Sequence, residues 1–222
     1  MGRQRFQDRL DDLRGSVLAM ADLVRDRLET AIEALDTGDE AAAREVLGGD
    51  DAVNRRYLDT EDACIDVFAL EQPVASDLRL VAASFKIITD LERIGDLAVN
   101  LAGYAIDPET DLDAVVNVEE LGRMALSMVD EAIEAYRDED VWRCHEIADR
   151  DDELDRLCEH ASEAVVRTLI DRERGEGELE PAIDAATRLL LVIRDLERVG
   201  DHAVNIAART LYVAENDDAL LY

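Results

Sequence analysis

Apolar residues recur along the first part of the chain in steps of four and three. The set is Phe6, Leu10, Leu13, Val17, Met20, Val24, Leu28, Ala31 and Leu35. A seam with this spacing is typical of one face of a long α-helix that packs against other helices. We predict that this helix ends at Gly38, because glycine suits a C-cap, and that Asp39 is the N-cap of the next helix.

The rest of the first half predicts two further helices. The second helix runs from Asp39 to about Leu70, with a possible interruption at Gly48-Gly49. Because proline disfavours helix in the residue before it, Gln72-Pro73 predicts a turn. A third helix then covers about 74–106.

The same order of signals begins again after the polar stretch 107–113, which is the predicted linker. A fourth helix follows the apolar positions Val115, Val118, Leu121, Ala125, Met128, Ala132 and Tyr136. A fifth helix covers about 140–170. The charged, glycine-bearing stretch 171–180 predicts a loop, and Pro181 opens the sixth helix.

A repeated undecapeptide supports a division into two halves. DLERIGDLAVN (90–100) and DLERVGDHAVN (195–205) share nine of eleven residues at an offset of 105. We therefore expect an all-α fold of two tandem three-helix bundles, over residues 1–106 and 114–222, related by an internal pseudo-two-fold repeat.

Composition limits the environment and the partners. Aromatic residues are only 4% of the chain, so the core must be aliphatic. There are 54 acidic and 24 basic residues, for a net charge of −30, and Lys86 is the only lysine. Such a surface resembles those of halophilic proteins, in which molar salt screens self-repulsion over about 3 Å. We expect a halophilic protein that is less stable in dilute buffer.

The same charge argues against a nucleic-acid partner, because no basic stripe could displace counterions from phosphates. No apolar run approaches the roughly 18 residues of a membrane span, and no signal-peptide pattern opens the chain. We therefore expect a cytoplasmic protein without membrane insertion. The three cysteines lack CxxC spacing, which favours buried thiols over a disulfide or a structural zinc site.

Each undecapeptide places two acids on one face of its helix. Glu92 and Asp96 are four residues apart, as are Glu197 and Asp201, so each pair stacks along one stripe. In so acidic a chain, one such pair has little weight. The repetition in both halves, with a glycine between the acids each time, makes the stripes candidate metal ligands.

A second set of acids lies on the preceding helix of each half. Asp151 and Asp155 are four apart in the second half, whereas the matching first-half residues are Asp50 and Asn54. If the two helices are antiparallel neighbours, their stripes converge on an oxygen-rich site that suits a hard or borderline divalent ion, or iron. The first-half site is expected to be smaller, weaker or absent because of Asn54.

Gly95 and Gly200 each cost about 1 kcal/mol in a helix interior relative to alanine. Close approach of a neighbouring helix would explain both. The alternative for the acids is a solvated face with weak ion pairs to Arg93. His202 is more often a capping or surface residue than a ligand in this setting, and Trp142 is expected to pack.

The chain resembles the PhoU family, and the resemblance covers nearly its whole length. It is carried by LRGSVLAMADLV (13–24), VLGGDDAVN (46–54), EQPVASDLRLVAASFKIITDLERIGDLAVNLA (71–102), RDDELD (150–155) and DLERVGDHAVNIA (195–207). The resemblance implies two tandem three-helix bundles and E(D)xxxD motifs that hold multinuclear clusters of iron, zinc or magnesium. By position, the implied ligands are Glu92, Asp96, Glu197, Asp201, Asp151, Asp155 and Asp50.

The resemblance also implies a function. Proteins of this family are regulators, not enzymes, and they restrain phosphate uptake and phosphate-starvation signalling. The implied partners are the ATPase subunit of the phosphate ABC transporter, a sensor histidine kinase and a second copy of the chain in a homodimer.

Two other classes remain open. One is a helical-bundle protein for metal storage or metal-dependent catalysis, although the Glu-x-x-His pairs of di-iron bundles are missing here. The other is a structural, dimerising bundle whose acids serve only solubility.

Overall fold

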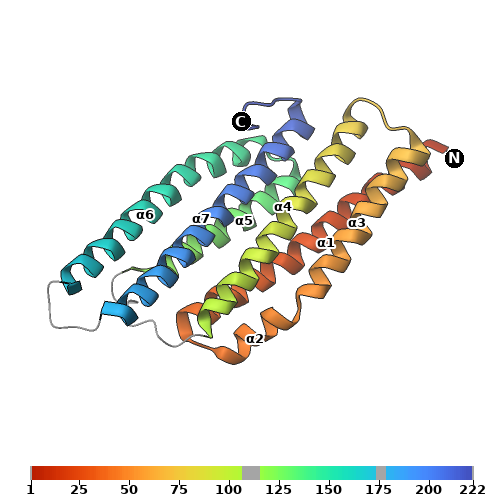
Figure 1. Ribbon diagram of the computed structural model, residues 1–222. Helices are drawn as coiled ribbons and strands as arrows, with labels where there is room; N and C mark the ends of the chain where they lie inside the picture. The colour runs from red at the N-terminus through yellow and green to blue at the C-terminus, as the bar shows by residue number, and fades with distance from the viewer. Residues whose placement is uncertain (1, 107–115, 174–178, 222) are drawn as a thin grey trace.

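The computed structural model describes residues 2–106, 116–173 and 179–221. Every regular element in these residues is a helix, which confirms the predicted all-α class. The helices are α1 (Gly2–Thr37), α2 (Glu40–Gly48), α3 (Asp50–Glu71), α4 (Ser76–Ala105), α5 (Val118–Asp138), α6 (Val141–Glu173) and α7 (Leu179–Glu215). The long helices lie side by side along one axis (Figure 1). The predicted linker 107–113 and Val115 fall outside the described residues.

α1 is a single helix of 36 residues whose predicted seam faces the core. Seven of the nine seam residues are at most 2% exposed. Gly38 leaves the helix with a φ of +68°, which glycine adopts without strain. The Asp39 carboxylate then accepts the N–H groups of Ala41 and Ala42 at 2.9 and 3.1 Å. Both predicted caps of this turn are confirmed.

The predicted second helix is two segments, because the chain breaks at Gly49. The Arg27 guanidinium lies where a Cβ on Gly49 would be and donates to the carbonyl of Val46 near the end of α2. A side chain at this position would displace the guanidinium. The possible interruption at Gly48-Gly49 is thus confirmed, and in the described residues α2 and α3 together take the place of the second of the six predicted helices.

The second half follows the predicted order with shifted boundaries. Asp140 caps α6 by accepting two N–H groups of its first turn. α6 continues to Glu173 and α7 begins at Leu179, so the predicted loop 171–180 was too long at both ends. Pro181 lies in the first turn of α7 instead of opening it, where its missing N–H costs no helical hydrogen bond.

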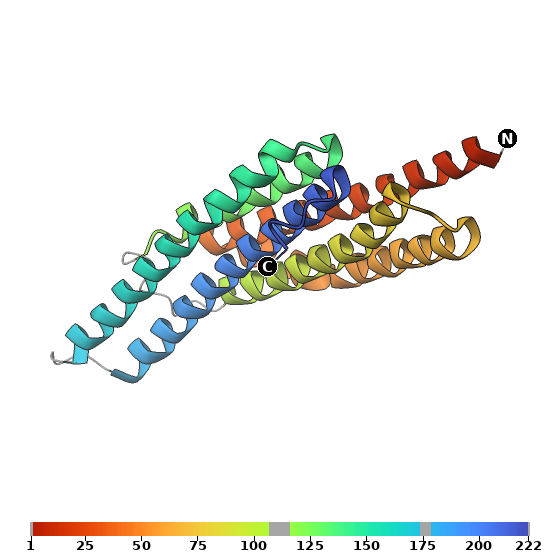
Figure 2. The same ribbon diagram turned by 90° about the horizontal axis from the view of Figure 1, so that it is seen from above.

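α4 and α7 occupy the centre and pack against each other. α4 also contacts α1 and α3, α7 contacts α5 and α6, and α1 contacts α5. One apolar core runs through all of these contacts, so the two three-helix sets share an interior. The halves are offset: α6 and α7 extend past the others at one end, and α1 and α3 at the opposite end (Figures 1 and 2).

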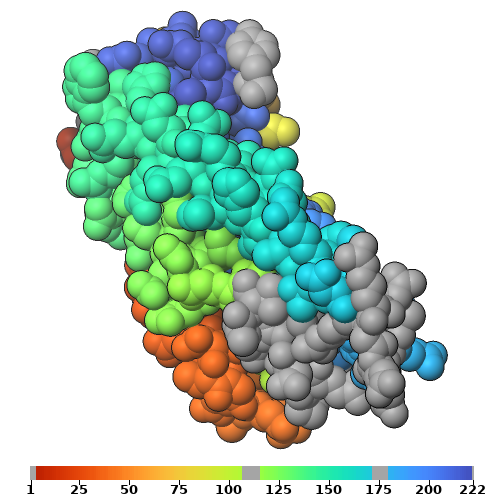
Figure 3. Space-filling model, turned by 90° about the vertical axis from the view of Figure 1, so that its left-hand side faces the viewer, coloured from red at the N-terminus to blue at the C-terminus, as the bar shows by residue number. Residues whose placement is uncertain are grey.

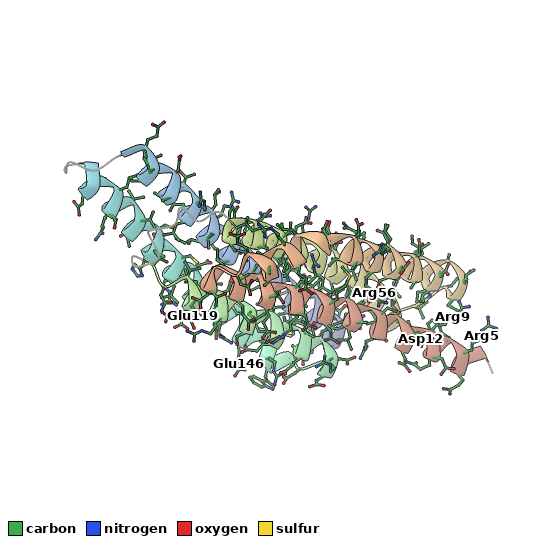
Figure 4. All side chains as sticks on the ribbon, turned by 90° about the horizontal axis from the view of Figure 1, so that it is seen from below. Arg5, Arg9, Asp12, Arg56, Glu119 and Glu146 are labelled. Carbon is green, nitrogen blue, oxygen red and sulfur yellow. The ribbon has the colours of Figure 1, made fainter. Side chains whose placement is uncertain are left out.

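Charged side chains lie on the outside of the bundle. α6 crosses a whole side of the molecule in Figure 3, with α2 at one end. Charged side chains such as Arg56, Glu119 and Glu146 lie on the outside of α3, α5 and α6 (Figure 4). The three cysteines are free and buried, as expected. No helix in the described part of the chain is long and apolar enough to cross a membrane.

Candidate functional site: paired acidic stripes around α4 and α7

The two undecapeptides lie on the two central helices and contact each other. The Asp90 carboxylate, at the start of the first copy, accepts a hydrogen bond of 3.2 Å from Asn205, at the end of the second. Conversely, Asp195 at the start of the second copy accepts one of 3.2 Å from Asn100 at the end of the first. The internal repeat relates these two contacts, because each joins the first residue of one copy to the last residue of the other copy. We call this pair of contacts the Asp–Asn clasp.

The two ends of the Asp–Asn clasp differ in their remaining partners. Asp195 is fully buried. It accepts two hydrogen bonds from Arg194, at 3.0 and 2.7 Å, and one of 3.2 Å from the hydroxyl of Tyr104. Asp90 is 15% exposed and lies 2.9 Å from Nδ1 of His202. The second-half aspartate therefore has the larger set of partners and the smaller access to water.

Sequence reasoning missed the Asp–Asn clasp, because it treated each undecapeptide as one helix face within its own half. A signal was present: an aspartate and an asparagine open and close both copies. His202 was expected to be a capping or surface residue, but its side chain is only 16% exposed and pairs with Asp90. Trp142 was expected to pack, but it is 82% exposed, because it follows the cap of α6 on the outer side of the bundle.

The second-half acids lie where α6 and α7 pack. A Cβ on Gly200 would be 2.6 Å from the Leu154 side chain and 3.0 Å from Oδ1 of Asp151. The predicted reason for this glycine, close approach of a neighbouring helix, is confirmed. Oδ1 of Asp151 is buried and has no hydrogen-bond partner among the described residues. An orphaned carboxylate oxygen of this kind is rare in proteins and calls for a partner such as an ion or water.

Burial and neighbouring carboxylates raise the pKa of three acids in this second-half cluster. Burial raises the pKa of Asp151 to about 7, with further contributions from the carboxylates of Asp155 and Asp201. Burial and the charge of Asp201 raise the pKa of Asp155. Burial, followed by the charges of Asp155 and Asp201, does the same for Glu197. The charge of Asp201 therefore acts on each of the other three predicted second-half residues.

The first-half acids lie where α2 and α3 meet α4, and they are partly neutralised. The side chain of Asn54 donates to Asp50 at 3.0 Å, in place of the second acid of the other half. Arg93 lies 3.5 Å from Glu92 and 3.7 Å from Asp96. Burial and the charge of Asp96 raise the pKa of Glu92, while Arg93 opposes the shift.

The matching second-half arginine behaves differently. Among the described residues, Arg198 forms no ion pair with Glu197 or Asp201. It lines a hollow of about 270 Å³ that Asp50 and Asp96 also line. It also lines a second hollow, of about 400 Å³, with Asp151 and Asp201. Arg198 thus lies between the acids of the two halves.

The first-half glycine also supports a close approach, although a looser one. A Cβ on Gly95 would be 3.2 Å from Cγ1 of Val53 and would meet no carboxylate.

Each predicted acid lies on the expected helix of its half. Nevertheless, in the part of the chain that the structure describes, no three His, Cys, Asp or Glu side chains are arranged so that they could hold a metal ion. Binding would require the carboxylates to turn toward a common point.

These observations define a class: an all-helical repeat protein whose two halves share a core, with one acidic stripe in each half. A family model described as the PhoU domain matches the chain twice, at residues 17–105 and 118–210. The chain belongs to the PhoU family.

Named relatives resemble the whole chain. The "Phosphate-specific transport system accessory protein PhoU homolog" of Pseudomonas aeruginosa is 33% identical over 97% of this chain and 87% of its own. The crystal structure of PhoU from Pseudomonas aeruginosa has a TM-score of 0.88 and 33% identity, and covers 96% of this chain and 100% of that one. The crystal structure of the phosphate transport system regulatory protein PhoU from Streptococcus pneumoniae has a TM-score of 0.84 at 26% identity, over 96% and 98% of the two chains.

Proposed function

We propose that this protein is a regulatory accessory protein that restrains phosphate uptake by contacting the phosphate ABC transporter through its ATPase subunit, on the cytoplasmic side of the membrane. The observation that carries this proposal is the full-length likeness to proteins named for phosphate transport, with both halves matched by the family model. Those relatives are named as accessory or regulatory proteins and not as enzymes. The protein is accordingly regulatory and non-enzymatic.

Metal binding is the second part of the proposal. The second half offers four carboxylates from two packed helices, and one buried oxygen, Oδ1 of Asp151, has no partner among the described residues. Burial, and after it repulsion from neighbouring carboxylates, raises the pKa of three of the four, and a cation would relieve the repulsion. Carboxylate oxygens suit magnesium, iron or zinc. The chemistry of the donor set therefore suits a divalent ion or a multinuclear cluster, which would bind once the carboxylates turn toward a common point.

We assign the stronger site to the second half. Asp151 and Asp155 on α6 would bind with Glu197 and Asp201 on α7. In the first half, Asn54 replaces an acid and Arg93 neutralises Glu92 and Asp96. A cation bound there competes with the arginine and has one charged ligand fewer.

A bound cation would change the surface that a partner meets. It would neutralise part of the acidic stripe at the α6–α7 junction, in a protein whose net charge is −30. Metal load can then alter the affinity for the transporter without any chemical reaction. Storage or catalysis is less well supported, because neither the relatives' names nor any Glu-x-x-His pair in the sequence favours it.

Deletion of the gene tests the regulatory role. Cells that lack the protein should take up phosphate constitutively, and the wild-type gene should restore repression. A Glu197→Gln/Asp201→Asn variant should restore repression poorly, whereas its first-half match, Glu92→Gln/Asp96→Asn, should restore most of it. Unchanged phosphate uptake in the deletion strain would refute the proposed function.

A further inference from the structure

Six large apolar side chains are exposed along α3, in the α3–α4 turn and in the first turn of α4. We call them the tip patch: Leu58, Ile65, Phe68, Leu70, Val74 and Leu78, which are 56, 49, 58, 63, 71 and 38% exposed. They are six of the eleven large apolar residues found exposed in the described chain. Concentrated exposure of this kind marks an interaction site more often than scattered single residues do.

The tip patch is not an extension of the core. The buried residues of α3 are Val53, Thr60, Cys64 and Val67. Leu58 and Ile65 are seven residues apart, so they share a helix face, and that face is opposite the buried one. α1 and α4 pack against α3 from the core side. The described helices therefore leave the outer line of α3 uncovered.

The fold presents the tip patch to other molecules. The α3–α4 turn lies at the end of the molecule where the N-terminus also lies, away from the projecting ends of α6 and α7 (Figures 1 and 2). Gln72 and Ala75 both have a φ of +50°, unusual for residues other than glycine. Between them Val74 is the most exposed member of the patch, at 71%. The backbone thus holds an apolar side chain outward at the tip.

Charge determines which occupant the tip patch would accept. Asp59, Asp62 and Asp66 are exposed beside Leu58 and Ile65 on α3, and Arg55 and Arg56 are the basic residues of the same helix. A second copy of the chain would bring the same carboxylates, and its net charge of −30, against this surface. Anionic lipid and nucleic acid are repelled for the same reason. A partner with an apolar face and basic residues beside that face would cover the apolar side chains and pair with the acids at their sides.

We propose that the tip patch is the docking surface for an amphipathic helix of a partner protein, with an apolar ridge flanked by lysine and arginine. An amphipathic helix that docks in this way uses apolar residues three, four and seven apart as its anchors. The inference rests on the proposed function, because it locates the face through which a transporter subunit or another regulated protein binds.

The second half provides a matched control. The middle helices of the two halves are related by an offset of 101 residues, as Asp50 and Asp151 are, and the helices of the undecapeptides by 105. Val166 therefore corresponds to Ile65, and Ile183 to Leu78. Val166 is 45% exposed and Ile183 is 44% exposed. Leu58, however, corresponds to Glu159, so the ridge is interrupted. Substitution of Val166 and Ile183 removes a similar exposed apolar surface from a face that the inference does not assign to the partner.

A peptide titration with the full chain tests the surface chemistry. The probe is a synthetic 18-residue helix with leucines on one face and lysines beside them, and its scrambled isomer is the composition control. In 0.5 M salt, wild-type protein should bind the helix at least tenfold more tightly than the scrambled isomer. Leu58→Gln/Ile65→Gln/Phe68→Gln should weaken binding about tenfold, and Val166→Gln/Ile183→Gln should change it less than twofold. Circular dichroism melts check that each variant is folded.

A pull-down with the purified transporter ATPase subunit separates this inference from the proposed function. Retention by wild type but not by the folded tip-patch variant supports both. Equal retention by the two leaves the proposed function standing and overturns the inference. Retention by neither refutes the proposed partner, and the peptide titration then decides the inference alone. A dimer in sedimentation that becomes a monomer in the tip-patch variant assigns the surface to a second copy and overturns the cationic partner.

Discussion

The two halves of this protein use the same undecapeptide in two different electrostatic settings. In the second half, burial and then neighbouring carboxylates, Asp201 among them, raise the pKa of Asp151, Asp155 and Glu197, and none of the three forms an ion pair with an arginine among the described residues. In the first half, Asn54 replaces an acid, and Arg93 contacts both carboxylates of the stripe. A repeat in sequence thus does not imply two equal sites.

What both halves retain is the contact between α4 and α7. Asp90 pairs with Asn205, and Asp195 pairs with Asn100, across the shared core. The first and last residues of the undecapeptide therefore join the halves, while its inner acids face the preceding helix of their own half. The inner positions could diverge because each depends on a different neighbour.

The largest expected difference is between the two ends of the Asp–Asn clasp. Asp195→Ala should lower the free energy of unfolding by about 3 kcal/mol, because it removes a buried carboxylate that four hydrogen bonds hold. Asp90→Ala should cost about 1 kcal/mol, since this carboxylate has two partners and some access to water. Chemical denaturation at molar salt measures both. Equal losses would show that burial does not distinguish the two ends.

The next difference concerns pH. Because the folded-state pKa of Asp151 is raised to about 7, the folded protein keeps a proton that the unfolded chain loses near pH 4. Its contribution to stability is therefore present at low pH and is lost as the pH rises toward 7. We expect metal-free protein to lose about 2 kcal/mol between pH 4 and 8 from this group, about half of the value without solvent screening.

The control for this prediction is the matching residue of the first half. Asp151→Asn should abolish most of the decline and make the protein more stable than wild type at pH 8. Asp50→Asn should keep the wild-type decline, because Asp50 already has Asn54 as a hydrogen-bond donor. Melting temperatures at fixed salt and several pH values measure the effect. If the stability of the Asp151→Asn variant declined with pH as steeply as that of wild type, the decline could not be assigned to Asp151.

The smallest expected difference concerns the two glycines. Gly200→Ala should cost about 1 kcal/mol, because the new methyl group collides with buried Leu154 and with Asp151, and this outweighs its better helix propensity. Gly95→Ala should lie within about 0.5 kcal/mol of wild type, since the 3.2 Å contact with Val53 roughly cancels the gain in propensity. Paired denaturation curves test this. A larger loss for Gly95→Ala than for Gly200→Ala would contradict the conclusion that the neighbouring helix approaches more closely at Gly200.

Much of the fold was predictable because it depends on local patterns. The seam of α1, its Gly38 and Asp39 caps and the positions of the six predicted helices follow from apolar spacing and capping chemistry. The break at Gly49 was only an option, because it depends on Arg27, which lies on another helix. The ends of α6 and α7 were misplaced because charged residues are as compatible with an exposed helix as with a loop.

The candidate site was predictable to the level of helix faces. Spacing placed Glu197 with Asp201 and Asp151 with Asp155, and Gly200 indicated that the two helices approach closely. The Asp–Asn clasp and the arrangement of His202 depend on how the halves pack, which a helical period does not encode. The raised pKa of Asp151 likewise arises from burial by residues distant in sequence.

The central claim is that the second-half carboxylates form the stronger metal site and that Asn54 accounts for the weakness of the first. Reciprocal exchange of the differing residue tests it most directly: Asp155→Asn, Asn54→Asp and the double variant, each titrated with Fe²⁺, Zn²⁺ and Mg²⁺ by calorimetry at pH 8. The account predicts that Asp155→Asn weakens the tighter site about tenfold or more, that Asn54→Asp strengthens the weaker one, and that the double variant exchanges their order. Binding that is identical in all three variants and in wild type would contradict it.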